Sequence, residues 1–271
     1  MIRTLFKHEF LRTWRWLLLV TLAAALVVSV MSGGAMLLPA PLNTVLAIVS
    51  AVVVMGYQLA LPLLISLDFY RSCYSKTGYF TAAIPARGAT IFKVKAAYAY
   101  LVSLLGVGIT LGLALVASIG AGGTVGASPR ESFAKVSDAV ALIGSLPTGV
   151  SIALAVTVLL YPVVCIAPFF FAATVGSQGW INRQGFGGVV LTWFLFYSAS
   201  QLLGMLSLFV PPSVDLRNYP DISLIWDPLT LFTVENNALV LPVAVFVTMF
   251  LVAIVAMSWA KVSYSRKLEL R

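Results

Sequence analysis

The sequence of 271 residues carries little charge. Only 10% of its residues are Asp, Glu, Lys or Arg, whereas about a quarter of a soluble globular chain is charged. Hydrophobic residues make up 61% of the chain, well above the roughly 45–50% of a soluble domain. These proportions exclude a soluble enzyme, an intrinsically disordered chain and a coiled coil.

Residue types that support acid–base or metal chemistry are also scarce. There is one histidine, His8, and the two cysteines, Cys73 and Cys165, lie far apart in the sequence, so neither a disulfide framework nor a zinc site can be read from them. The glycine-rich residues 120–126 lack the lysine of a phosphate-binding Gly-x-x-x-x-Gly-Lys-Ser/Thr loop. We therefore expect this chain to have no enzyme activity, no metal site and no bound cofactor.

The sequence does contain six long apolar stretches. Each is long enough for an α-helix that crosses a bilayer, and none contains Asp, Glu, Lys, Arg or His. They are residues 16–38, 45–67, 97–120, 148–175, 189–210 and 239–260. The first is longer than the apolar core of a typical signal peptide, and five more follow it, so we expect it to be retained as a membrane span. The sequence thus predicts an all-α membrane protein with six transmembrane helices in a single domain, residues 1–271.

The basic residues fall in alternate connections. Fourteen of the 17 lie in residues 1–15, 68–96, 176–188 and 261–271. Because cytoplasmic loops are enriched in Lys and Arg, both termini are predicted to be cytoplasmic. We attribute the net charge of +8 to loops beside anionic lipid and expect no nucleic-acid partner. The expected location is the cell (plasma) membrane of a bacterium.

Two of the external connections have recognisable patterns. Ser128-Pro129-Arg130-Glu131 is a capping box, which predicts a short helix over residues 129–142. Residues 211–238 combine four acidic residues and four prolines with apolar residues such as Trp226. This mixture favours either short helices that lie at or dip into the outer interface, as a re-entrant region, or a loosely ordered loop with Trp226 in the aromatic belt.

The N-terminal residues 2–16 are amphipathic at the helical period. Phe6 and Phe10 lie on the apolar side, and Lys7 lies near the boundary. The polar side gathers His8, Glu9, Arg12 and Arg15. We expect an interfacial helix along the inner membrane surface that turns into the first span. Its role is either that of a plain juxtamembrane anchor or that of a lever between a cytoplasmic partner and the membrane helices.

The cytoplasmic segment 68–96 is longer than a simple turn needs. Residues 68–76 can extend the second span, Gly78 can end that helix, and residues 90–95 can begin the next one. This pattern predicts a helical hairpin. Apolar residues gather at its bend: Tyr79, Phe80, Ile84 and Pro85. They form either a docking surface for a partner or a surface that folds back onto lipid.

This segment carries a family resemblance. The run Gly78-Tyr-Phe-Thr-Ala-Ala-Ile-Pro-Ala-Arg87, followed by Ile91-Phe-Lys-Val-Lys95, resembles type-2 exporter permeases of the ATP-binding cassette (ABC) family. In that family a Gly-Tyr-Leu-Thr run ending in Pro and Arg follows the second span, and a lysine opens the third. The opening Leu5-Phe-Lys-His-Glu-Phe-Leu-Arg12 resembles the family's usual start. The motifs cover about 40 residues, the six-span plan covers the whole chain, and Ala86 stands where Ser or Val is common.

The resemblance implies a permease subunit of an ATP-driven exporter. Two such subunits, as a homodimer or heterodimer, would surround the transport pathway, and separate ATPase subunits would bind ATP and magnesium. The coupling contact with the ATPase would be made by Gly78, Tyr79, Phe80, Ile84, Pro85 and Arg87. A connecting helix along the membrane would include Phe6, Lys7, Glu9 and Phe10. Residues 211–238 would match the family's external re-entrant region.

A few polar and small residues inside the predicted spans have two interpretations. Gln58 and Gln201 either form interhelical hydrogen bonds or line a substrate route. Gly108 and Gly112 allow close helix packing, within one subunit or between subunits.

Two other functions stay open at this point. An ion-coupled secondary transporter would suit two inverted three-helix repeats, but ion coupling usually needs an ionisable group within the spans, and the six stretches contain none. A non-catalytic membrane assembly scaffold is compatible with the composition. For a transporter, the charge-free spans favour hydrophobic or amphipathic cargo.

Overall fold

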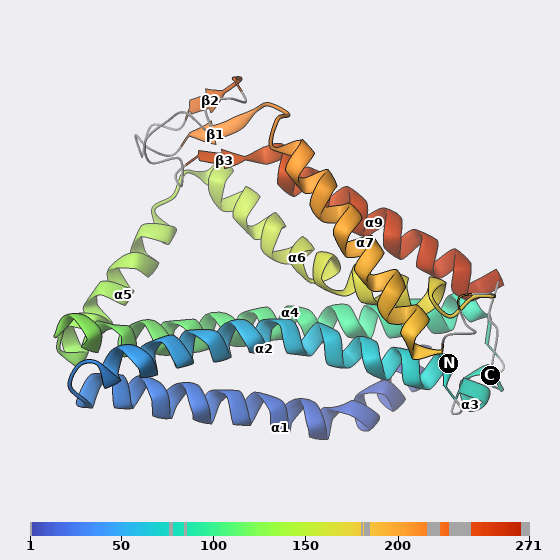
Figure 1. Ribbon diagram of the computed structural model, residues 1–271, viewed down its shortest axis with the longest axis horizontal. Coiled ribbons are helices and arrows are strands. Elements are labelled where there is room, and N and C mark those ends of the chain that lie inside the picture. Colours follow the sequence, from blue (N-terminus) through green and yellow to red (C-terminus); the bar gives the residue numbers. More distant parts are fainter. Residues whose placement is uncertain are drawn as a thin grey trace. The chain divides into compact units, whose positions relative to one another are not determined.

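The computed structural model describes residues 2–75, 78–83, 86–179, 181, 185–215, 223–227 and 240–266. Six of its helices are long and apolar enough to cross a membrane (Figure 1). They are α1 (Ile2–Leu37), α2 (Leu42–Tyr74), α4 (Gly88–Gly122), α6 (Thr148–Val175), α7 (Phe186–Ser207) and α9 (Val243–Arg266). These helices correspond to the six apolar stretches, so the prediction of a multi-pass helical membrane protein is confirmed by helix length and composition.

The chain divides into two compact units. The first contains Met1–Ile65 and Lys93–Pro162, and the second contains Ser66–Phe92 and Val163–Arg271. Helices α2, α4 and α6 each contribute one end to each unit.

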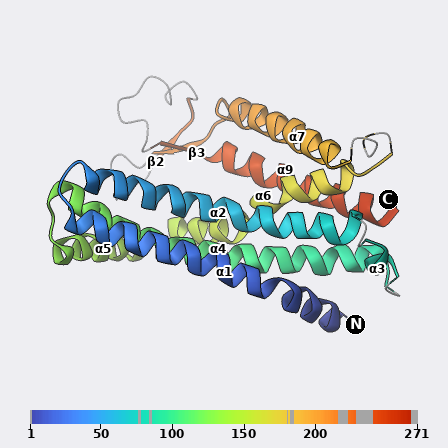
Figure 2. The same ribbon diagram turned by 60° about the horizontal axis from the view of Figure 1, so that its bottom comes forward.

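In the first unit, α1, α2 and α4 run side by side (Figures 1 and 2). Their shared core contains the buried side chains of Val28, Tyr57 and Leu113. Glycines let the helix backbones approach closely, since a Cβ atom on Gly120 of α4 would lie 2.6 Å from the Cα atom of Ser32 in α1. This packing depends on the absence of a side chain rather than on apolar area alone.

Helix α1 is continuous from Ile2 to Leu37. Residues 2–16 and the first span therefore form one helix without a break, and the position of residues 2–16 along the inner membrane surface stays a prediction. The physical reason lies in the sequence, because residues 2–32 contain neither glycine nor proline and nothing interrupts the helical hydrogen bonds.

The predicted helix over residues 129–142 is confirmed as α5 (Pro129–Gly144), which follows the short 3-10 helix η1 (Gly123–Val125). The Ser128 side chain accepts a hydrogen bond from the Glu131 backbone N–H at 3.3 Å, and the Ser128 backbone N–H donates to Glu131 Oε2 at 2.9 Å. This second bond, to the charged form of the carboxylate, is the main reason that the pKa of Glu131 is lowered. The reciprocal pair fixes where α5 begins.

The second unit contains α7 and α9 side by side, together with part of α6 (Figures 1 and 2). Helices α6 and α9 meet through small buried residues, Ala167, Ala253 and Ala256. Gly204 of α7 lies against Met249 of α9, whose Cε atom would be 2.5 Å from a Cβ atom at that glycine.

The second unit also contains a small antiparallel sheet of β1 (Ser213–Asp215), β2 (Ser223–Ile225) and β3 (Val240–Pro242), in the order β2-β1-β3. Val214 pairs with Leu224 on one side and with Leu241 on the other. Two alternatives were predicted for residues 211–238, short helices at the outer interface or a loosely ordered loop, and for residues 213–215 and 223–225 the helical alternative is wrong. The prolines beside and within these segments disfavour a continuous helix, and cross-strand pairing satisfies their backbone groups instead. Residues 216–222 and 228–239 lie outside the described residues, so the re-entrant alternative stays a prediction.

Candidate functional site

The segment between α2 and α4 contains a five-residue helix, α3 (Gly78–Ala82). The Gly78 N–H donates to Ser75 O at 2.7 Å, and Thr81 Oγ1 donates to Ser72 O at 2.6 Å. Gly78 therefore begins α3, and the prediction that it ends the preceding helix is wrong, because α2 already ends at Tyr74. The Ser75 hydroxyl takes part in this ending by donating a hydrogen bond to the Arg71 carbonyl in the last turn of α2.

The residues predicted for the coupling contact have different environments. Tyr79 is 57% exposed on α3, whereas Gly78 is buried. Arg87 is exposed, and its carbonyl accepts from the Thr90 N–H at 2.8 Å, so this residue opens α4. The backbone of Phe80 lies in α3, while Ile84 and Pro85 lie outside the described residues.

Both helices that flank α3 are anchored by buried aromatic rings, which we call the aromatic cluster. Its members come from four helices and are all at most 5% exposed: Phe69 and Tyr74 of α2, Phe92 of α4, Phe170 of α6 and Tyr264 of α9. The Phe69 and Phe170 rings stack with centroids 4.3 Å apart, and the Phe69 and Phe92 rings meet edge to face at 6.0 Å. Phe92 also lies 5.9 Å from Tyr264. The rings therefore connect the two ends of the α3 segment to α6 and α9.

Further contacts bring the start of α4 close to the end of α9. A Cβ atom on Gly88 would lie 3.6 Å from the Cα atom of Ser265. Two residues earlier in α9, Ser263 accepts a hydrogen bond from the Gln178 side chain, which follows the end of α6. These contacts join the start of α4, the end of α9 and the segment that follows α6.

A second polar contact lies in the first unit, between the beginning of α1 and the beginning of α4. Lys95 Nζ donates to Glu9 Oε1 at 2.7 Å, and Arg12 Nη2 donates to Glu9 Oε2 at 2.5 Å. Thr13, which is fully buried, forms a hydrogen bond with the Tyr98 hydroxyl. These residues define the α1–α4 contact: Glu9, Arg12, Thr13, Lys95 and Tyr98.

The α1–α4 contact changes the predicted faces of the N-terminal helix. Glu9 was predicted on the polar side with Arg12, but it is only 9% exposed because it faces α4. Phe10 is 51% exposed, Lys7 is exposed, and Phe6 is half-buried with its ring edge-on to Tyr98 at 5.3 Å. The buried stripe of this helix is therefore polar. The charged Glu9 carboxylate can be buried in it because two cations, Lys95 and Arg12, bind that carboxylate.

The remaining predicted residues lie in the spans. Thr110 Oγ1 of α4 donates to Gln58 Oε1 of α2 at 2.7 Å, so Gln58 takes part in an interhelical hydrogen bond. Gln201 is exposed on α7. Gly108 and Gly112 are exposed, and within the described part of the chain no atom lies within 4 Å of a Cβ atom built on either one. Close packing inside the subunit occurs at Gly120 instead.

The described residues contain no group of three or more His, Cys, Asp or Glu side chains that could hold a metal ion. The interactions found at the helix ends are ion pairs, hydrogen bonds and aromatic contacts.

Sequence reasoning missed the aromatic cluster and the Glu9–Lys95 pair. The signal for the cluster was the spacing of Phe69 and Tyr74 just beyond the apolar stretch, but its partners in α6 and α9 are distant in sequence. The chain was compared with protein-family models, with curated proteins and with solved structures, and none of the three comparisons finds a match.

Proposed function

We propose that the chain is the membrane-spanning permease subunit of an ATP-driven exporter of the ABC type, with the ATPase on a separate chain. The observation that carries this proposal is the short helix α3 between two long helices whose ends are anchored in one aromatic cluster. A short helix that presents the exposed Tyr79 side chain and is tied to the last turn of α2 suits a mechanical contact with a partner that changes shape. The family resemblance of residues 78–87 points the same way.

The aromatic cluster gives this contact a route into the membrane helices. Thr81 ties α3 to the last turn of α2, and the rings of Phe69 and Phe92 then pack on Phe170 of α6 and Tyr264 of α9. Each close aromatic pair contributes about 0.5–1.5 kcal/mol beyond its buried area. A force applied to α3 would therefore act on a rigid assembly that includes the ends of α2, α4, α6 and α9.

The charge distribution supports a cytoplasmic position for α3. Residues 68–96 carry five of the 17 basic residues, which favours retention of this segment on the inner side. In the proposed topology both termini share that side, and α5 and the small sheet lie on the outer side.

The N-terminal part of α1 fits the proposed role of a connecting helix. Its exposed apolar residues, including Phe10 and Trp14, can contact lipid, while Glu9 holds it to α4. We further propose that two copies, or one copy and a related permease, surround the pathway. Gln201 and the open surface at Gly108 and Gly112 are available for that contact or for the pathway itself. The apolar walls favour hydrophobic or amphipathic cargo.

The test is to isolate the tagged chain in mild detergent from the cells that make it and to measure magnesium-dependent ATP hydrolysis. We expect a co-purifying ATPase, and we expect Tyr79→Ala to lower its recovery several-fold because this side chain is exposed on α3. Ser137→Ala on α5 is the matched control, since it changes an exposed side chain far from α3 in sequence.

Two results would contradict the proposal. A chain that never associates with an ATPase, even when co-expressed with a cassette subunit encoded beside it, would remove the energy source and leave the scaffold interpretation. Transport in ATP-depleted vesicles under an imposed ion gradient would favour the ion-coupled transporter.

A further inference from the structure

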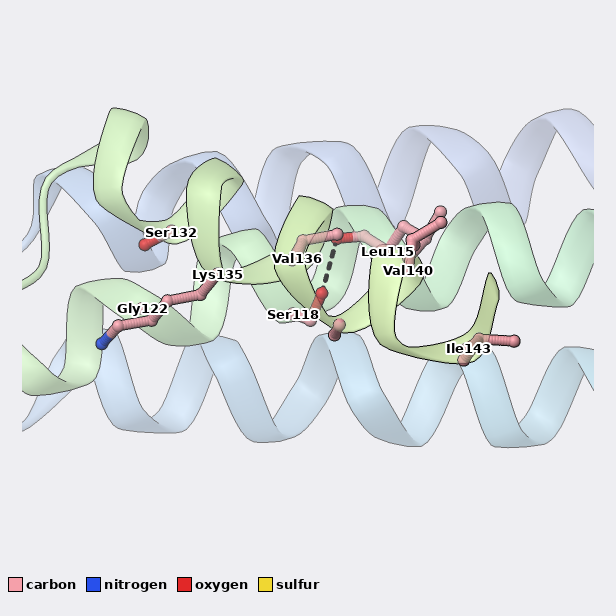
Figure 3. A pocket seen from close by; sticks show the side chains of 9 residues that line it. Leu115, Ser118, Gly122, Ser132, Lys135, Val136, Val140 and Ile143 are labelled. Atoms are coloured by element: carbon pink, nitrogen blue, oxygen red, sulfur yellow. Dashed lines mark hydrogen bonds between the residues drawn. The ribbon is translucent and has the colours of Figure 1, made fainter. Parts of the chain in front are cut away.

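A cavity of about 310 Å³ lies in the first unit between α5 and the last two turns of α4 (Figure 3). Ligand sites usually have about 300–1,000 Å³, so this volume is enough for part of a small amphiphile. The α5 side of the cavity is a helical stripe that includes Ser132, Lys135 and Val136. The cavity is open on one side, and α5 is exposed over nearly all of its length.

The cavity has a polar end and an apolar end. Figure 3 shows Ser132, Lys135 and Gly122 at one end and Leu115, Val140 and Ile143 toward the other. Gly122 is the last residue of α4, and Leu115 lies about 10 Å further into the helix at 1.5 Å per residue. From Gly122 toward Leu115 the lining therefore changes from polar to apolar, as the surroundings do from the surface of a membrane to its interior.

The polar end contains a hydroxyl group with nothing to bind. Ser132 is 3% exposed, and its Oγ atom has no hydrogen-bond partner in the described chain. It lies so close to Gly122 that a Cβ atom there would clash with it. A buried hydroxyl without a partner costs free energy, so this end of the contact between α5 and α4 is not optimised for packing alone.

Lys135 supplies positive charge at the same end. Its side chain extends toward Gly122 in Figure 3, and Lys135 is an exposed residue. Glu131 lies four residues earlier and Asp138 three residues later on α5, and within the described residues neither forms a salt bridge with Lys135. The charge of Lys135 can therefore reach a ligand at the rim.

We propose that this cavity binds one anionic membrane phospholipid. The phosphate group lies at Lys135, and an acyl chain follows the apolar side chains toward Leu115 and Ile143. A soluble anion would leave the largely apolar lining uncovered, whereas a neutral lipid would not use the charge. Lipid at this place joins α5 to α4 and does not depend on the proposed exporter function.

The experiment is native mass spectrometry of the full chain after delipidation, with dioleoyl phosphatidylglycerol, dioleoyl phosphatidylcholine or glycerol phosphate added separately. We expect a single phosphatidylglycerol adduct, retained about tenfold more strongly than phosphatidylcholine, as one charge-assisted hydrogen bond predicts. Lys135→Gln should remove this preference. Ala139→Trp, which fills the cavity, should remove the adduct of either lipid.

Arg130→Gln is the matched control, because it removes a cation from the same helix outside the cavity lining and should leave the preference unchanged. Equal retention of the two lipids, or a phosphatidylglycerol adduct that survives both Lys135→Gln and Ala139→Trp, would overturn the proposal. Tight binding of glycerol phosphate alone would also overturn it and indicate a site for soluble anions. None of these outcomes depends on an ATPase, so failure here leaves the proposed function untouched.

Discussion

The α1–α4 contact allows a quantitative prediction about stability. The side chains of Glu9 and Lys95 are only 12% and 6% exposed, and their charged atoms are 2.7 Å apart. Removing one partner of a buried ion pair costs about 3–5 kcal/mol, because the remaining charge stays buried. We therefore expect Glu9→Gln to lower the free energy of unfolding by at least about 3 kcal/mol.

Lys95→Met should cost less, about 1–2 kcal/mol, because Arg12 remains beside Glu9 and is 32% exposed, so that solvent screens part of the interaction. The double variant Glu9→Gln with Lys95→Met should be more stable than Glu9→Gln alone, since no ammonium group is then left buried. This corresponds to a coupling energy of about 2–3 kcal/mol between the two positions.

The assay is unfolding in mixed micelles of increasing SDS content, followed by the fluorescence of the six tryptophans. Lys93→Met is the matched control, because Lys93 is exposed two residues earlier on the same helix and its loss should change stability by less than about 0.5 kcal/mol. The reasoning would be refuted if the losses of unfolding free energy in Glu9→Gln and Lys95→Met simply added in the double variant. A Glu9→Gln variant as stable as the parent would also refute it.

Three further predictions concern packing and capping. Phe170→Ala should lower the free energy of unfolding by about 3–5 kcal/mol because it opens a void in the aromatic cluster. Phe194→Ala, at a ring that is 58% exposed, should lower it far less in the same assay. Similar losses in the two variants would contradict a packed cluster. Gly120→Ala should lower the free energy of unfolding by about 1–3 kcal/mol because the added methyl group pushes α1 away from α4. Gly112→Ala, beside open space, should leave it unchanged or raise it slightly. The reverse order would contradict the observed approach of the helices. Because the pKa of Glu131 is lowered in the folded chain, its capping contribution to stability is complete above the ordinary glutamate pKa and is lost as pH falls through the folded pKa. Amide hydrogen exchange at the start of α5, corrected for intrinsic rates, should therefore become faster on acidification in the parent. The same acidification should not change it in Glu131→Gln.

The sequence predicts those parts of the fold that depend on local signals. The apolar stretches predict six long helices because a bilayer needs about 20 apolar residues whatever the tertiary packing. Ser128 and Glu131 predict the start of α5 because both hydrogen bonds of a capping box form within four residues.

The parts that the sequence did not predict depend on contacts between distant segments. Glu9 and Lys95 are 86 positions apart, and the helical period alone places Glu9 with the solvent-facing charges. The rings of the aromatic cluster extend from position 69 to position 264. The small sheet pairs segments of three residues, which are too short to show a strand period.

Cross-linking from α3 tests the central claim most directly. A photoreactive maleimide on Tyr79→Cys, in the native membrane, should form an adduct with a nucleotide-hydrolysing subunit, because Tyr79 is exposed there while the native Cys73 is buried and Cys165 is half-buried. The same probe on Ser137→Cys should not form this adduct. A Tyr79→Cys probe that reacts only with lipid, or that finds no nucleotide-hydrolysing partner, would contradict the account.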